Sequence, residues 1–178
     1  MDLKQQLLDI GKKAKYAASK LSVTKSETKT QALKIASEEI LKNEKEIISA
    51  NKIDIQNAKK NVLSEHLIDR LKLDKKRIES ISNSLVDIAY FEEPVGKVIS
   101  EWERPNGLKI QKITVPIGVI GIIYESRPNV TADASALSVK SGNAVILRGG
   151  KDSFHTSLKI FKILNEVFNN NGLPKHSI

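Results

Sequence analysis

The stretch VPIGVIGIIYESRPNVTADASALSVKSGNAVILRGG, residues 115–150, decides the fold. It holds two apolar runs, VIGIIY (119–124) and AVILR (144–148), on either side of VTADASALSVK (130–140), which has the composition of a helix. Short runs rich in β-branched residues are typical of strands that are buried on both faces of a parallel sheet. A strand, a helix and a second strand with short connections therefore predict a right-handed βαβ unit.

The residues that follow extend this unit. Gly142 is expected to end the helix in the left-handed conformation, just before the second strand. After that strand, FHTSLKIFKILNEVFNN (154–170) has the pattern of another helix, with Asp152 and Ser153 as candidate caps. The fold class is therefore α/β, with the first βαβα part of a doubly wound parallel sheet in residues 115–178.

Residues 1–94 have helical patterning instead. Apolar residues recur at helical spacing in three segments: 3–14, 32–51 and 78–88. The second segment predicts one long helix that ends near Asn51, followed by a short helix and a loop in 52–64. Asp74 is a good N-cap for the third segment, which should stop before Pro94. This part of the chain is interpreted as an N-terminal helical layer.

Residues 95–114 separate these two regions and alternate between apolar and polar side chains. Asn106-Gly107 in their middle is a strong hairpin signal, so strands are expected at 97–104 and 108–114. Trp102 suits either a core position or an interface. The predicted division is thus an N-terminal helical part, a hairpin and the first half of an α/β domain.

The composition narrows the class of protein. The 178 residues contain no cysteine, which excludes disulfides, thiolate metal sites and a cysteine nucleophile within this chain. No apolar run has the length of a membrane span, and the charged N-terminus is unlike a secretory signal, so a cytoplasmic protein is expected. The net charge of +8 is spread along helices, which favours a solvated basic surface over a nucleic-acid footprint.

Ligands of open α/β sheets bind beyond the carboxyl ends of the strands, which here precede two polar loops. The loop 125–129 contains a carboxylate, a hydroxyl, an arginine and an amide. The loop 148–153 contains Arg148, two glycines and Lys151 at a helix start, an arrangement that admits a phosphate. The spacing alone favours neither an anion site nor an ordinary βα loop with a glycine-rich turn.

Several longer strings are more specific. YESRPNVT (124–131), SGNAVILRGG (141–150), SEHLIDRLKLD (64–74), ERPNGLKIQK (103–112) and NGLP (171–174) occur in this order. With VPIGVIGIIYE before them, they make the chain similar to the gamma-glutamyl phosphate reductase family of the aldehyde dehydrogenase superfamily. The resemblance covers almost the whole chain.

The resemblance implies an NADPH-dependent enzyme that converts gamma-glutamyl phosphate to glutamate-5-semialdehyde and phosphate in proline biosynthesis. In such enzymes a cysteine thiolate attacks the acyl carbon, and an amide side chain and a backbone N–H hold the oxyanion. The resemblance assigns residues 1–94 to the helical part of the cofactor domain, 95–114 to a hairpin for oligomerisation or bridging, and 115–178 to the first half of the NADP-binding α/β domain, without the catalytic domain. It also implies a homo-oligomer, with glutamate 5-kinase as a possible pathway partner.

The resemblance assigns the first loop to the substrate. Asn129 is the candidate oxyanion amide, and Ser126 or Arg127 would face the substrate. Arg127 would hold the phosphate or carboxylate of the substrate, or else form a structural pair with Glu125.

The resemblance assigns the second loop to NADP(H). Contacts are expected at Ile123, Arg148, Gly149, Gly150 and Lys151. Lys151 lies where NAD-preferring relatives have a glutamate that grips the ribose hydroxyls. A lysine there would attract the 2′-phosphate that a glutamate would repel, which favours NADPH over NADH.

The family's chains are more than twice as long, and their nucleophilic cysteine lies in the later half. This chain is therefore expected to be a truncated N-terminal portion that is inactive alone and that tends to associate through its open sheet edge. Two alternatives remain: a non-catalytic nucleotide-binding or interaction remnant, and a basic nucleic-acid binder.

Overall fold

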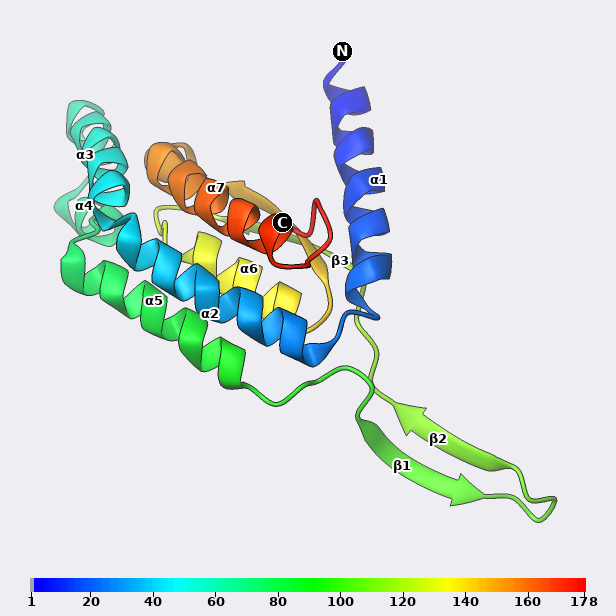
Figure 1. The fold of residues 1–178 in the computed structure, drawn as a ribbon. Coiled ribbons are helices and arrows are strands. Elements are labelled where there is room, and N and C mark those ends of the chain that lie inside the picture. The colour runs from blue at the N-terminus through cyan, green and yellow to red at the C-terminus, as the bar shows by residue number, and fades with distance from the viewer. Residues whose placement is uncertain (1) are drawn as a thin grey trace.

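The computed structural model describes residues 2–178, and it shows a layered body from which one hairpin projects (Figure 1). In chain order, its elements are α1 (Leu3–Leu21), α2 (Ser26–Lys42), α3 (Glu44–Lys60), α4 (Glu65–Leu71), α5 (Lys75–Tyr90), β1 (Val98–Glu103), β2 (Lys109–Ile113), β3 (Val119–Tyr124), α6 (Val130–Lys140), β4 (Ala144–Gly149), the 3₁₀ turn η1 (Lys151–Ser153) and α7 (Phe154–Asn170).

The predicted βαβ unit is confirmed. Strands β3 and β4 pair in parallel, from Val119 opposite Ala144 to Tyr124 opposite Gly149, and α6 connects them. Gly142 follows α6 with a φ of +74°, as expected for a left-handed helix end. A Cβ at this glycine would lie 2.9 Å from Cγ of Pro116, so the turn requires glycine for its space as well as its conformation.

The prediction that β3 and β4 are both buried on both faces is wrong. Ile123 of β3 is 78% exposed, whereas Ala144 and Val145 at the start of β4 are buried. Helix α6 packs on the two strands, and α1 contacts them near the end from which the hairpin leaves. On the other edge of β4, the N–H of Val145 donates to the carbonyl of Ser177 at 2.9 Å.

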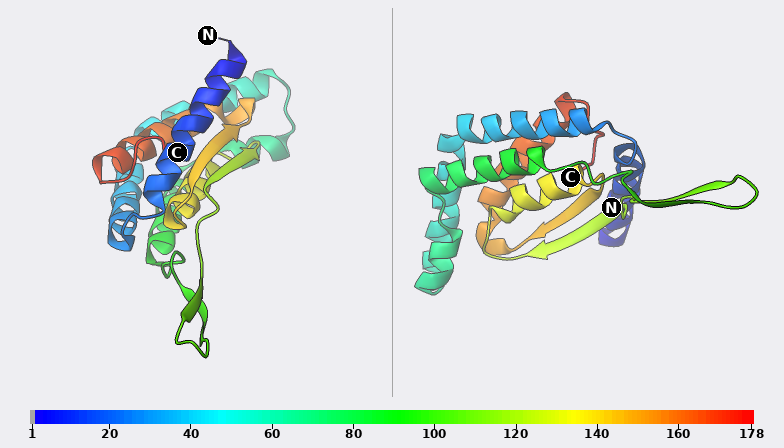
Figure 2. Two further views of the ribbon diagram at one scale, coloured as in Figure 1. Left: turned by 90° about the vertical axis from the view of Figure 1, so that its right-hand side faces the viewer. Right: turned by 90° about the horizontal axis from the view of Figure 1, so that it is seen from below.

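The helical layer packs on this unit, as its apolar patterning predicts. Helices α2 and α5 lie side by side, with α6 and α7 between them and the strands (Figure 2, right). One cluster of buried apolar side chains extends from α1 to the end of α7. Its fully buried members include Leu33, Ile78, Leu85, Ile160 and Leu164. The two halves of the chain therefore share one core.

The prediction of a single helix over 32–51 is wrong, because the helix breaks at Asn43. There the side-chain Nδ2 and the backbone N–H of Asn43 both donate to the carbonyl of Glu39. This local bonding satisfies the end of α2, and the chain turns sharply into α3 (Figure 1). Helix α3 then continues to Lys60, where a short helix and a loop were expected.

The cap predicted at Asp74 is confirmed. Its Oδ1 accepts the N–H of Arg77 at 2.9 Å, and α5 ends at Tyr90, before Pro94.

None of the helices within residues 2–178 has the length and apolar character needed to cross a membrane.

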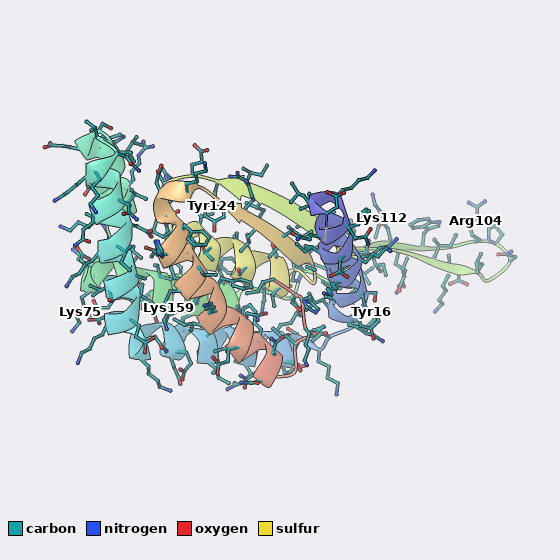
Figure 3. The ribbon with its side chains drawn as sticks, turned by 90° about the horizontal axis from the view of Figure 1, so that it is seen from above. Tyr16, Lys75, Arg104, Lys112, Tyr124 and Lys159 are labelled. Carbon is teal, nitrogen blue, oxygen red and sulfur yellow. The ribbon has the colours of Figure 1, made fainter. Side chains whose placement is uncertain are left out.

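The hairpin is also confirmed. Strands β1 and β2 pair antiparallel, and Gly107 in their turn has a φ of +81°. The hairpin extends away from the body as an arm, with Arg104 near its tip (Figures 1 and 3). Trp102 on the arm is 45% exposed, so it lies outside the core of this chain.

Candidate cofactor and substrate site

The two loops predicted to carry chemistry lie next to each other. Because Tyr124 and Gly149 are register partners, both strands end at the same edge of the sheet. Figure 3 shows Tyr124 at the end of the sheet that is remote from the arm. A Cβ on Gly150 would lie only 3.3 Å from Cα of Glu125. The glycines after β4 thus let the second loop approach the first.

Tyr124 supports this arrangement. Its hydroxyl forms a hydrogen bond of 2.7 Å with Oγ1 of Thr131 in the first turn of α6. A Cβ on Gly149 would lie 3.2 Å from the same hydroxyl. The tyrosine therefore ties the end of β3 to α6 and covers the backbone of Gly149.

A cavity of about 610 Å³ runs along β4 between α1 and α7. Its lining is mostly apolar and includes Ile146, Leu147 and Phe154. Three of the five predicted cofactor residues also line it: Arg148, Gly149 and Gly150. The other two, Ile123 and Lys151, are exposed side chains outside the lining. All five nevertheless lie at one end of the sheet, because Ile123 is the register partner of Arg148 and Lys151 directly follows Gly150.

Asp54 of α3 holds the start of α7, directly after the second loop. Its carboxylate accepts the N–H groups of His155 at 3.1 Å and Thr156 at 2.8 Å, and the hydroxyl of Thr156 at 2.5 Å. A carboxylate at a helix N-terminus also interacts favourably with the helix dipole. These two N–H groups are thus already bonded and are not available to a phosphate.

The role of Asp54 was not identified from the sequence, although the residue pattern of α3 indicates a buried polar side chain there. The buried stripe of this helix consists of Ile47, Asn51, Asp54 and Ala58, so it contains two polar residues. Buried polar groups need partners, which makes such positions structurally informative. Asn51 donates to the carbonyl of Leu71 and accepts the N–H of Leu73, and it thereby holds the segment between α4 and α5.

The first loop has a constrained backbone and a free cation. Ser126 is buried and has a φ of +50°, in the left-handed region that is costly for a residue with a Cβ. Arg127 follows it and is exposed. Among residues 2–178, no ion pair joins Arg127 to Glu125, so the alternative of a structural pair is wrong.

Asn129, the candidate oxyanion amide, precedes the first residue of α6, and its side chain makes no capping hydrogen bond to this helix. Its Nδ2 donates to Oδ2 of Asp133 at 3.0 Å, which engages one of its two N–H groups. Asp133 is half-buried, and burial raises the pKa of its carboxyl, an effect that the bond from Asn129 opposes. The amide is therefore oriented by Asp133 rather than free to rotate.

A second cavity, of about 300 Å³, lies between this loop and the helical layer. Arg127, Asn129 and Asp133 line it on one side, and residues of α4, α5 and the segment between them line it on the other. We call it the α4–α5 cleft. The sequence pattern did not indicate that the helical layer contributes to this site.

Two buried lysines lie where the arm leaves the body. Lys29 is 1% exposed, and its Nζ pairs with Oε1 of Glu93 at 2.7 Å. Burial raises the pKa of Glu93, but hydrogen bonds from Lys29 and other donors outweigh this and hold it below its usual value. Lys140 donates to Oγ1 of Thr30 and to the carbonyl of Ala89, and burial lowers its pKa. This network fastens the base of the arm to α2, α5 and α6.

The fold and the paired loops define the class of protein. An aldehyde dehydrogenase from Bacillus subtilis superposes on 97% of this chain with a TM-score of 0.68 and 20% sequence identity. A benzaldehyde dehydrogenase from Corynebacterium glutamicum does so on 93% with a TM-score of 0.67 and 21% identity. At these identities the likeness concerns the fold alone. The chain therefore has the fold of the first part of an aldehyde dehydrogenase.

More similar relatives carry the name of one enzyme. The gamma-glutamyl phosphate reductase of Brucella suis is 49% identical over 99% of this chain, and that of Clostridium novyi is 47% identical over all 178 residues of this chain, which match 43% of its own length. The crystal structure of the Thermotoga maritima reductase covers 96% of the chain with a TM-score of 0.93 and 39% identity. The chain corresponds to the N-terminal portion of gamma-glutamyl phosphate reductases.

The chain spans 42% of the length of the Brucella suis relative and 41% of the Thermotoga maritima structure. No protein-family model matches it.

Proposed function

We propose that this chain is the cofactor-side portion of an enzyme that reduces gamma-glutamyl phosphate to glutamate-5-semialdehyde and phosphate with NADPH, in proline biosynthesis. The observation that carries the proposal is the identity of 49% to a gamma-glutamyl phosphate reductase over 99% of the chain. The adjacency of the two polar loops at one end of the sheet supports it, because ligands of such sheets bind there.

The residues present fit a dinucleotide. Gly149 and Gly150 let the second loop lie against Tyr124 and Glu125, and the exposed cations of Arg148 and Lys151 lie beside them. Close backbone approach and nearby positive charge are what a phosphate group requires. Arg148, Gly149, Gly150 and Lys151 would hold the cofactor, with Ile123 at the end of β3. When bound, NADPH supplies the hydride.

In the proposed reaction, the residues of this chain bind the substrate and orient it. Asn129 would donate a hydrogen bond to the oxyanion, oriented by Asp133. Ser126 and Arg127 would contact the substrate, with Arg127 as the cation for its phosphate or carboxylate. The thiolate that attacks the acyl carbon is not among these 178 residues, since they contain no cysteine. The isolated chain therefore binds without catalysing reduction.

The arm is the surface we assign to a second copy of the protein. Its exposed apolar side chains include Val98, Ile99, Trp102, Leu108 and Ile113. Contiguous exposed apolar surface marks interaction sites, and an edge strand offers unpaired backbone groups. Glutamate 5-kinase is the pathway partner, because it supplies the acyl phosphate.

Two alternatives make different predictions for binding: a non-catalytic nucleotide-binding remnant, and a basic nucleic-acid binder. We expect calorimetric titration of the purified chain to detect NADPH, and to detect duplex DNA only weakly at either of two salt concentrations. DNA binding that weakens steeply with salt, without NADPH binding, would contradict the proposal and favour the nucleic-acid binder. Cofactor-dependent turnover by the chain alone would contradict its inactivity.

A further inference from the structure

The α4–α5 cleft carries an inference that rests on the proposed function and extends it. The cleft lies between the α4–α5 segment and the start of α6. Two hydroxyls, of Ser80 and Ser84, line it one turn apart on α5. It is thus a concave polar site built from three separate segments of the chain.

The cations of the cleft are not all used by the fold. Arg77 binds the carboxylate of Asp69 at 3.1 Å and the carbonyl of Lys72 at 2.7 Å, so its charge is neutralised within the helical layer. Arg70, Lys72 and Arg127 also line the cleft, and none of the three has an ion-pair partner among residues 2–178. Three free cations therefore surround one cavity.

Two carboxylates line the cleft, and of these Asp69 is paired with Arg77, whereas Asp133 has no ion pair among residues 2–178. Asp133 lines the cleft, and its one side-chain partner is the amide of Asn129, which is uncharged. Burial raises the pKa of Asp133, and no positively charged side chain pairs with it among residues 2–178. An ammonium group in the cleft would supply that charge. The three free cations attract any anion, so it is the ammonium contact with Asp133 that favours a zwitterion over a plain anion.

We propose that the α4–α5 cleft binds the amino-acid end of gamma-glutamyl phosphate. Arg70, Lys72 and Arg127 receive the α-carboxylate, and Asp133 receives the α-ammonium. Charges of both signs in one cavity select a zwitterion over a plain anion.

The position of the cleft suits this role. Arg127 and Asn129 belong both to the cleft and to the loop that lies against Gly150. A substrate held by its amino-acid end in the cleft therefore extends toward the predicted cofactor loop. Arg70, Lys72 and Asp133 become specificity-determining residues, and Arg127 acts on the α-carboxylate rather than on the phosphate.

The test uses the purified 178-residue chain and three probes, followed by the shifts of backbone amides in NMR spectra. L-Glutamate has both α groups, glutarate lacks the ammonium, and 4-aminobutyrate lacks the α-carboxylate. We expect L-glutamate to shift amides around the cleft, and the other two to bind about tenfold more weakly, because each loses a charge-assisted hydrogen bond.

Matched variants make the test specific to the cleft. Lys72→Ala and Asp133→Asn should each weaken L-glutamate binding about tenfold. Lys76→Ala removes an exposed lysine of α5 that does not line the cleft, and it should leave binding unchanged. Circular dichroism of each variant verifies that it is folded.

Three results would overturn the inference: no amide shifts in the cleft at high L-glutamate, equal binding of glutarate and L-glutamate, or equal displacement of L-glutamate by inorganic phosphate. Titration of the same sample with NADPH separates this inference from the proposed function. NADPH binding without glutamate binding removes the assignment of the cleft and leaves the cofactor-side role intact.

Discussion

Replacing Asp54 with alanine is expected to lower the free energy of unfolding by about 3 kcal/mol. Asp54 is 1% exposed and accepts three hydrogen bonds from the first residues of α7. Alanine leaves the N–H groups of His155 and Thr156 without this acceptor in a buried position and removes the negative charge from the helix N-terminus. Equilibrium urea unfolding followed by circular dichroism measures the loss.

Asp74→Ala is the matched control. Asp74 also caps a helix, but it is exposed and accepts one N–H, from Arg77. Its removal should cost about 1 kcal/mol. Asp54→Asn should fall between the two, because it keeps an acceptor oxygen and loses the charge. Equal losses for Asp54→Ala and Asp74→Ala would contradict the role assigned to Asp54.

Replacing Lys151 with glutamate is expected to reduce the preference for NADPH over NADH by at least about tenfold, the loss that corresponds to 1.4 kcal/mol. Lys151 is exposed at the start of η1 and has no ion-pair partner among residues 2–178. A carboxylate in its place would repel the 2′-phosphate of NADPH and accept hydrogen bonds from the ribose hydroxyls of NADH. The ratio of the two kcat/KM values reports the change.

This measurement needs a complete active site, so it uses a hybrid in which residues 1–178 of this chain replace the corresponding segment of the Thermotoga maritima reductase. Lys162→Glu is the control, because Lys162 is an exposed lysine of α7 that lines neither cavity. An unchanged ratio for Lys151→Glu, or an equal change for Lys162→Glu, would exclude a specific contact with the 2′-phosphate.

Local patterns of sequence predicted the βαβ unit, the hairpin and the cap at Asp74, because each depends on residues that are close in the chain. The break at Asn43 was not predicted, since the apolar spacing continues through it while the asparagine bonds to Glu39. The exposure of Ile123 was not predicted either, because the burial of a strand's two faces depends on which other elements pack against them.

In the candidate site, too, the features that depend on local sequence were predictable and those that depend on tertiary packing were not. The adjacency of the two loops could be expected from parallel strand order, whereas the bonds from Asp54 to Thr156 join residues far apart in sequence. The α4–α5 cleft likewise combines α4, α5 and the start of α6. No spacing rule within a single segment indicates that Lys72 and Asp133 line one cavity.

The hybrid with the Thermotoga maritima reductase also tests the central claim most directly. The assay follows NADP⁺ reduction in the presence of glutamate-5-semialdehyde and phosphate, which is the proposed reaction in reverse. We expect the hybrid to be active and the 178-residue chain alone to be inactive. A hybrid that is folded but inactive, beside an active parent enzyme, would contradict the claim that this chain is the cofactor-side portion of a gamma-glutamyl phosphate reductase.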